Sequence, residues 1–261
     1  MNVRVLASGS KGNCIYIEGD HGALLVDAGL SAREILKRVE TAGGTADHIQ
    51  AILVTHEHTD HIRGVDVLAR RLSIPVIATR GTLSEYLDHR RVSRKPVESM
   101  ACRYSEPLFL GDFVIEPFPT SHDAVEPCGF CIREHDLEVG CCTDTGQISP
   151  AMLEHLKRCD ALVLESNHCP DMLEKGPYPA YLKRRIRDAK RGHLSNIACA
   201  ACLKSLADDL HAVTLAHLSE VNNRPEIALA TATGDGGLGL FAGSIPVRVA
   251  RQHDITESMQ V

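Results

Sequence analysis

The chain has 261 residues, of which 44% are hydrophobic and 24% are charged. These proportions are typical of a globular protein and exclude an intrinsically disordered chain. The net charge of −6 argues against a protein that coats nucleic acid with its whole surface, although it is compatible with a local basic groove. The length predicts a single domain over residues 1–261.

The start of the chain lacks the charged segment and apolar run of a signal peptide, and no later stretch is long and apolar enough to cross a bilayer. We therefore expect a soluble, cytoplasmic protein with no membrane partner. The ten cysteines include the adjacent Cys141 and Cys142 and the pair Cys199 and Cys202. Adjacent residues of a strand face opposite sides, and no second cysteine pair stands at zinc-knuckle spacing. The pattern predicts free, mostly buried thiols in a reducing compartment.

The first half of the chain alternates strand and helix patterns. A strand over 3–6, a tight loop over 8–13 and a hairpin of strands 14–18 and 23–26 lead to Asp27. Ser31 and Glu34 form a capping box that starts a helix, and Gly43 ends it. A buried strand over 51–54, a helix over 64–72, a strand over 75–78 and a helix over 82–91 follow. The last helix leads into a basic segment that contains Arg90, Arg91, Arg94 and Lys95.

The second half continues in the same way. Strands are predicted over 113–118, 128–133, 137–143, 161–164, 212–216 and 246–250. Ser149 and Pro150 open a helix to residue 157, with serine as the cap and proline at the first helical position. Residues 178–191 predict a basic helix, which Gly192 ends. Helices over 196–206 and 225–233 complete the pattern.

Side chains able to bind metal follow several strands directly: Asp27, His56, His122, Asp144 and His217. The densest group is His-Glu-His-Thr-Asp-His at residues 56–61. His56 and His58 point to the same side if the strand geometry persists, and Asp60 and His61 can then face a second ion. The bland alternative is a polar loop with coincidental histidines. The sequence therefore indicates a mixed α/β protein with one active edge.

The His-x-His-x-Asp-His pattern resembles the signature of the metallo-β-lactamase superfamily. Asp27 in Val-Asp-Ala-Gly, His122 in Thr-Ser-His-Asp-Ala, Asp144 in Thr-Asp-Thr-Gly and His217 in Leu-Ala-His-Leu-Ser match its other motifs in order. The resemblance implies an α/β (α+β) fold, a four-layer αβ/βα sandwich with two facing mixed sheets.

The resemblance also implies two divalent metal ions. The first is held by His56, His58 and His122, the second by Asp60, His61 and His217, with Asp144 bridging and Asp27 orienting the ligands; Asp60 is also counted as catalytic. Zinc suits these ligands best, with manganese or iron as alternatives. A hydroxide held between the ions is the implied nucleophile. His58 stands where redox members tend to carry Glu, which favours hydrolysis.

Two further residues extend the implied chemistry. Gly192-His193-Leu-Ser resembles the catalytic histidine motif of phosphodiesterase branches, and Glu165 matches the carboxylate paired with it. The alternative for His193 is a helix-cap neighbour without chemistry. Within that branch, Ser-Gly-Ser-Lys-Gly-Asn, Glu-Ser-Asn-His and His-Leu-Ser-Glu-Val-Asn-Asn look like the bacterial WalJ/YycJ-like family, whose members are nucleases, including 5′ to 3′ DNA exonucleases. Cys169 departs from the expected Asp, and His168 and Asp123 have no assigned role.

The predicted substrate is therefore nucleic acid, with DNA favoured over RNA. Candidate substrate-binding residues are Lys183, Arg184, Arg191 and Asn196, although a basic helix is often only a solvated face. The short spacings from His122 to Asp144 and on to His193 leave no room for a tRNA-gripping arm or a β-CASP domain. Two alternatives stay open: hydrolysis of small phosphodiesters or thioesters at the same site, and a non-catalytic metal-bound scaffold. The oligomeric state is left open.

Overall fold

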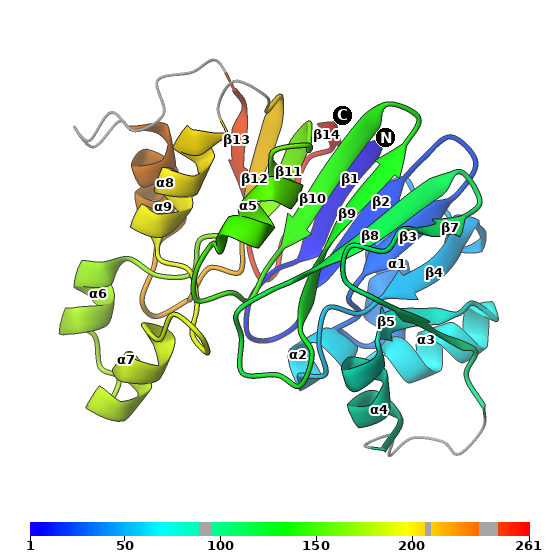
Figure 1. Cartoon of the computed structure of the whole chain (residues 1–261), viewed down its shortest axis with the longest axis horizontal. Coiled ribbons are helices and arrows are strands. Elements are labelled where there is room, and N and C mark those ends of the chain that lie inside the picture. Colours follow the sequence, from blue (N-terminus) through cyan, green and yellow to red (C-terminus); the bar gives the residue numbers. More distant parts are fainter. Residues whose placement is uncertain (89–95, 207–209, 235–244) are drawn as a thin grey trace.

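Two seven-stranded sheets face each other, and helices cover the outer face of each (Figure 1). The computed structural model describes residues 1–88, 96–206, 210–234 and 245–261. The layers run helix, sheet, sheet, helix, so the predicted four-layer sandwich is confirmed. No described helix has the length and apolar character needed to cross a membrane.

The first sheet has the strand order β14-β1-β2-β3-β4-β5-β6. Its strands are β1 (Asn2–Ala7), β2 (Cys14–Glu18), β3 (Ala23–Val26), β4 (Ile49–Leu53), β5 (Val76–Thr79), β6 (Ser99–Cys102) and β14 (Met259–Gln260). The helices that belong to this half are α1 (Ala32–Thr41), the 3-10 turn η1 (Ala46–His48), α2 (Thr59–Ile62), α3 (Val65–Leu72) and α4 (Arg80–Asp88). Strands β3 to β6 run parallel, so their carboxyl ends share one edge.

The second sheet has the order β13-β12-β11-β10-β9-β8-β7. Its strands are β7 (Leu108–Leu110), β8 (Phe113–Pro119), β9 (Cys128–Glu134), β10 (Leu137–Cys142), β11 (Ala161–Glu165), β12 (Ala212–Ala216) and β13 (Val247–Val249). Its helices are α5 (Pro150–Leu156), α6 (Pro170–Lys175), α7 (Ala180–Ile186), α8 (Asn196–Ser205) and α9 (Pro225–Thr233). Strands β10 to β13 run parallel, and β8 points the same way because β9 is antiparallel to both β8 and β10.

The core follows from the alternation of apolar residues along the strands. Val5, Leu24, Phe130 and Val163 belong to one cluster that joins the inner faces of the two sheets. Two further clusters join each sheet to its own helices. The described cysteines are all free and nine of the ten are buried, as predicted, with Cys169 partly exposed.

The basic helix predicted over 178–191 is wrong in its extent. The helix α7 covers only Ala180–Ile186, and the chain then turns. The Asp188 carboxylate accepts hydrogen bonds from the backbone N–H groups of Lys190 and Arg191 at 2.8 and 3.1 Å. This local side-chain bonding competes with the helical pattern and ends it. The prediction for Arg90, Arg91, Arg94 and Lys95 lies outside the described residues.

Several short elements were not predicted. The elements α2, α6, β6, β7 and β14 are short and lack a hydrophobic period of their own. The predicted serine caps are confirmed, since the Ser31 and Ser149 hydroxyls accept from the N–H groups of Glu34 and Met152. The Glu34 carboxylate accepts from Nε of Arg38, so the reciprocal half of the capping box is not shown.

Candidate metal centre and active site

The predicted metal ligands converge at the edge where the carboxyl ends of β3, β4, β8, β10 and β12 meet. Three overlapping groups consist of predicted ligands alone, and in each of them all potential ligand atoms lie within 4.8 Å of one another; a fourth group joins Asp144 and His217 to Glu165 and His193. The first three groups are His56, His58 and His122; His56, His61 and Asp144; and Asp60, His61 and His217. Residues far apart in the chain are thus brought to one place, as the sequence predicted.

Four of the histidines are held through one ring nitrogen. Nδ1 of His56 lies 3.0 Å from the Thr55 hydroxyl, and Nδ1 of His61 lies 2.7 Å from Oδ2 of Asp27. Nδ1 of His122 lies 3.1 Å from the Gly192 carbonyl, and Nδ1 of His217 lies 2.9 Å from Oε1 of Glu165. A partner on Nδ1 fixes the ring and leaves Nε2 for another contact, which is the arrangement of metal-binding histidines.

The free ring nitrogens face shared space. Nε2 of His56 and Nε2 of His217 are buried and have no hydrogen-bond partner among the described residues. Nε2 of His61 lies 3.2 Å from Oδ2 of Asp144, which is itself buried. Unpartnered buried nitrogens are costly, and imidazole and carboxylate are the donors that divalent transition metals accept. The His and Asp clusters therefore fit divalent metal binding.

Three of these positions have a left-handed backbone. The φ angles of Asp27, Asp144 and His217 are 62°, 55° and 54°. A non-glycine residue in this region is strained, and such residues concentrate at functional sites. The turn of the backbone after β3, β10 and β12 directs each side chain to the shared edge.

Glu165 links the cluster to His193. Its Oε1 lies 2.8 Å from Nδ1 of His193 and 2.9 Å from Nδ1 of His217. Its Oε2 accepts the backbone N–H groups of Thr145 and Leu194 at 2.8 and 3.1 Å. Burial alone would raise the pKa of Glu165, but its contacts with His193 and His217 lower it to about 2. The buried carboxylate therefore stays ionised.

The contact with Glu165 also changes the pKa of His193. Burial opposes its protonation, but the charges of Glu165 and Asp144 outweigh burial and raise the pKa of His193. Its ring centre lies 5.0 Å from that of His122 and 5.2 Å from that of His217. The ring of His193 is thus held between the two groups of candidate ligands.

A model of the beta-lactamase superfamily domain matches residues 23–217. The chain belongs to this superfamily.

Two curated superfamily members resemble most of the chain. An Exodeoxyribonuclease YycJ from Bacillus anthracis is 37% identical over 87% of this chain and 86% of its own. An Exodeoxyribonuclease WalJ from Streptococcus pneumoniae is 37% identical over 90% of both chains. Among solved structures, the metallo-beta-lactamase fold protein YhfI from Bacillus subtilis aligns with a TM-score of 0.73 at 17% identity, covering 98% of this chain and 99% of its own. The recognised superfamily is therefore confirmed, and with it an enzyme of the metallo-hydrolase class.

Two residues of this superfamily member were missed by the sequence analysis. Asn13 is buried, and its Nδ2 lies 3.0 Å from Nε2 of His61 and 3.4 Å from Oδ2 of Asp60. The Ser8 hydroxyl accepts the backbone N–H of His217 at 2.6 Å. Both residues lie in the glycine-containing loop after β1, which was interpreted as a turn. The sequence feature that could have indicated a functional loop is the pair of glycines, Gly9 and Gly12, directly after the first strand.

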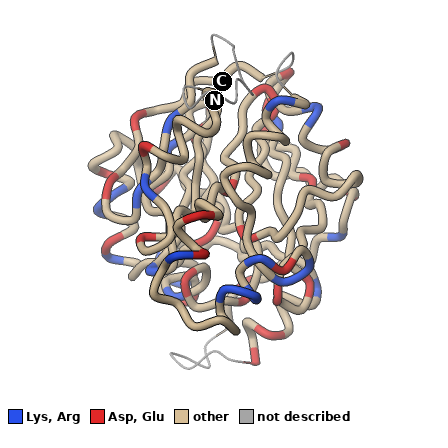
Figure 2. Tube along the Cα trace, turned by 90° about the vertical axis from the view of Figure 1, so that its left-hand side faces the viewer, with Lys and Arg blue, Asp and Glu red and all other residues tan. Residues whose placement is uncertain are grey.

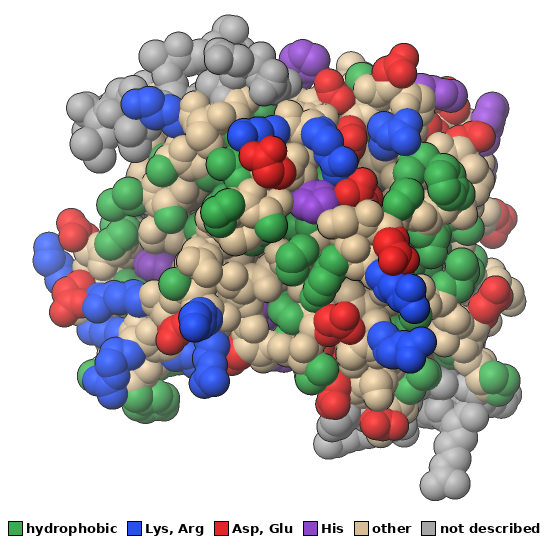
Figure 3. Space-filling model, in the orientation of Figure 1, with side chains coloured by type: hydrophobic (Ala, Val, Ile, Leu, Met, Phe, Trp, Pro, Cys, Tyr) green, Lys and Arg blue, Asp and Glu red, His purple; other side chains and the backbone are tan. Residues whose placement is uncertain are grey.

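The four predicted substrate-binding residues differ in whether their side chains are exposed or already hydrogen-bonded within the protein. Basic side chains gather over α7, at the lower left of Figure 3. Arg184 and Arg191 are exposed, whereas Nζ of Lys183 donates to the Glu174 carbonyl at 2.6 Å. Asn196 is buried, and its amide is engaged with Ser166 and Asn223. This placement does not support a direct substrate contact for Asn196 and gives it a role in packing the loops behind His193.

The structure also shows the contacts of Asp123 and His168, to which the sequence analysis assigned no role. Asp123 pairs with Arg185 of α7 through Oδ2, while its Oδ1 lies 3.2 Å from Nε2 of His122. His168 is buried at the base of the loop after β11, where its carbonyl accepts the N–H of Asn196.

Figure 2, which looks onto the side of α6 to α9, shows acidic residues interspersed with the basic ones.

Proposed function

We propose that this protein is a metal-dependent DNA exonuclease that digests DNA in the 5′ to 3′ direction. The contact of Glu165 with both His193 and His217 carries the proposal, because it ties a charged imidazole to the candidate metal centre. The names of the YycJ and WalJ relatives support DNA as the substrate. The cytoplasm is the proposed location.

We assign the first metal to His56, His58 and His122 and the second to Asp60, His61 and His217, with Asp144 shared. Zinc fits these nitrogen and carboxylate donors best, with manganese or iron as alternatives. Divalent ions lower the pKa of a bound water toward neutrality and so supply a nucleophile. Asp27 and Glu165 position the histidines by holding Nδ1 of His61 and His217.

His193 is the proposed electrostatic catalyst. Because Glu165 holds Nδ1, the protonated ring can direct Nε2 to the phosphate that is cut. There it neutralises the charge that develops on the phosphoryl oxygens and can give a proton to the leaving oxygen. Arg184 and Arg191 are exposed in the segment that leads to His193 and would contact backbone phosphates.

The test is a set of labelled single-stranded DNA, double-stranded DNA and RNA substrates, with bis(p-nitrophenyl) phosphate as the small phosphodiester, each with added zinc or manganese. We expect wild type to shorten DNA from the 5′ end. His193→Ala should lower the rate about 10²- to 10⁴-fold while its metal content stays that of wild type.

His211→Ala is the matched control, since His211 is exposed and lies away from the cluster. Hydrolysis of the small phosphodiester without cleavage of any nucleic acid would replace the nuclease proposal by a small-molecule phosphodiesterase. Full activity of His193→Ala would remove the role of His193.

A further inference from the structure

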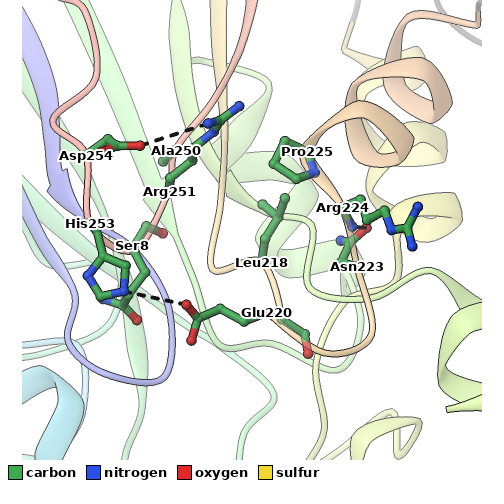
Figure 4. A pocket seen from close by; sticks show the side chains of 12 residues that line it. Ser8, Leu218, Glu220, Asn223, Arg224, Pro225, Ala250, Arg251, His253 and Asp254 are labelled. Atoms are coloured by element: carbon green, nitrogen blue, oxygen red, sulfur yellow. Dashed lines mark hydrogen bonds and ion pairs between the residues drawn. The ribbon is translucent and has the colours of Figure 1, made fainter.

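A cavity of about 390 Å³ lies next to the candidate metal centre (Figure 4). Its walls come from three segments that are distant in the sequence: Ser8 after β1, residues 218–225 between β12 and α9, and residues 250–254 after β13. The volume falls within the roughly 300–1,000 Å³ that small-molecule pockets enclose. Nothing assigned so far uses this cavity.

The cavity shares its wall with the metal centre. Ser8, which lines it, accepts the backbone N–H of His217, and the lining residue Leu218 follows His217 directly. Gln252 accepts the N–H of Lys11 at 2.8 Å and donates to the Gly12 carbonyl at 2.9 Å. Gln252 therefore fixes the loop that brings Asn13 to His61. A molecule in the cavity therefore lies against the loops that hold His217 and Asn13 rather than on a remote surface.

The walls combine apolar and polar groups. Leu218, Pro225 and Ala250 provide apolar surface (Figure 4). The polar part of the wall holds two ion pairs: Nε2 of His253 lies 3.6 Å from Glu220, and Nη1 of Arg251 lies 4.0 Å from Asp254 (Figure 4). Both donors and acceptors are thus available, but their charges are paired.

This combination determines the kind of ligand. The carboxylates of Glu220 and Asp254 each have a cationic partner, since Nζ of Lys11 lies 2.6 Å from Glu220, and Arg224 adds a further cation to the lining, so the walls carry no excess of one charge that would select the ligand. A purely apolar ligand would leave the polar wall unpartnered, which is costly. A nucleobase is uncharged and flat, has apolar faces, and carries hydrogen-bond donors and acceptors on its edges.

We propose that this cavity is a base-binding subsite for the nucleotide next to the phosphodiester that is cut. The inference rests on the proposed nuclease function and adds how the substrate is held. The base packs against Leu218 and Pro225, and its edge faces Arg251 and Glu220. The phosphate of the same nucleotide then lies on the side of His217. Binding of this base holds the adjacent phosphodiester bond in position, so a strand that carries the base should be cut faster than one that lacks it.

The test compares a DNA oligonucleotide with one that carries an abasic tetrahydrofuran unit in place of the nucleotide beside the cleaved bond. Wild type with its metals should cleave the base-bearing strand about tenfold faster in kcat/KM. Pro225→Trp, which fills the cavity, should reduce this ratio to about one. Arg251→Ala, which removes a hydrogen-bonding wall without filling the cavity, should reduce it in part and serves if Pro225→Trp does not fold.

Ile197→Trp is the control, because Ile197 is half exposed on α8 and does not line the cavity. It should keep the wild-type ratio. Equal rates of wild type on both strands, or an unchanged ratio in both cavity variants, would overturn the subsite while leaving the nuclease intact. Absence of DNA cleavage by wild type would instead reject the proposed function.

Discussion

Oε1 of Glu165 lies 2.8 Å from Nδ1 of His193, and the same oxygen lies 2.9 Å from Nδ1 of His217. One buried carboxylate atom thus positions both the proposed electrostatic catalyst and a candidate metal ligand. Neither histidine can rotate without affecting the partner of the other.

Replacement of this carboxylate should change the pH profile. In Glu165→Gln the negative charge that raises the pKa of His193 is lost, so the imidazolium should deprotonate at lower pH. The alkaline limb of log kcat/KM against pH should move to lower pH, and kcat should fall. Glu154→Gln, on the exposed side of α5, is the control. An unchanged alkaline limb with reduced kcat would show that Glu165 acts only through structure.

Asp27 should control metal affinity. Its Oδ2 lies 2.7 Å from Nδ1 of His61, and its Oδ1 accepts the N–H of Thr55 at 2.9 Å. Asp27→Asn keeps the shape but removes the charge, so we expect a loss of about 10- to 100-fold in metal affinity. Competition titration with a chelating dye measures it. The exposed Asp47→Asn should bind metal like wild type, and equal affinities of the two variants would contradict the role of Asp27.

Salt dependence should report the phosphate contacts. Arg184→Ala combined with Arg191→Ala should raise KM for DNA, and the slope of log K against log salt should become shallower by about 2. Fluorescence anisotropy with labelled DNA at several salt concentrations measures this slope. Arg33→Ala combined with Arg71→Ala removes the same charge from α1 and α3 on the opposite side of the molecule (Figure 1). Identical slopes in both double variants would place the DNA elsewhere.

The buried His168 should make the protein sensitive to acid. Burial lowers the pKa of His168 from 6.5 to about 4, because the charged form loses its hydration. Above pH 6.5 the ring is neutral in both folded and unfolded chains, and its contribution to stability is complete. Between pH 6.5 and 4 the unfolded chain binds the proton first, so the free energy of unfolding falls by about 3 kcal/mol.

Urea unfolding of the chelator-treated protein at a series of pH values measures this loss. His168→Gln cannot titrate and should show a flatter dependence on pH than wild type, whereas the exposed His48→Gln should follow wild type. Parallel curves for wild type and His168→Gln would show that the acid sensitivity comes from other groups.

The sequence predicted the candidate site well where side chains able to bind metal stand at the ends of predicted strands. His56, Asp144 and His217 each follow an apolar run directly, so the edge could be predicted before the sheets were known. The local sequence pattern did not predict features that depend on contacts between residues distant in the chain. Asn13 reaches His61 because its backbone bonds to Asp60 and Gly29 and because Gln252, far along the chain, fixes its loop. The end of α7 depends on the Asp188 side chain, and the burial of Asn196 depends on Asn223.

The left-handed backbone of Asp27, Asp144 and His217 implies a trade between stability and chemistry. Glycine would adopt these angles without the cost of about 1 kcal/mol or more that a side chain brings. A descendant of this fold that had lost its reaction would gain stability by drifting to glycine or asparagine at these three positions. The two aspartates and the histidine thus tie a local backbone cost to the side chains that the candidate metal centre needs.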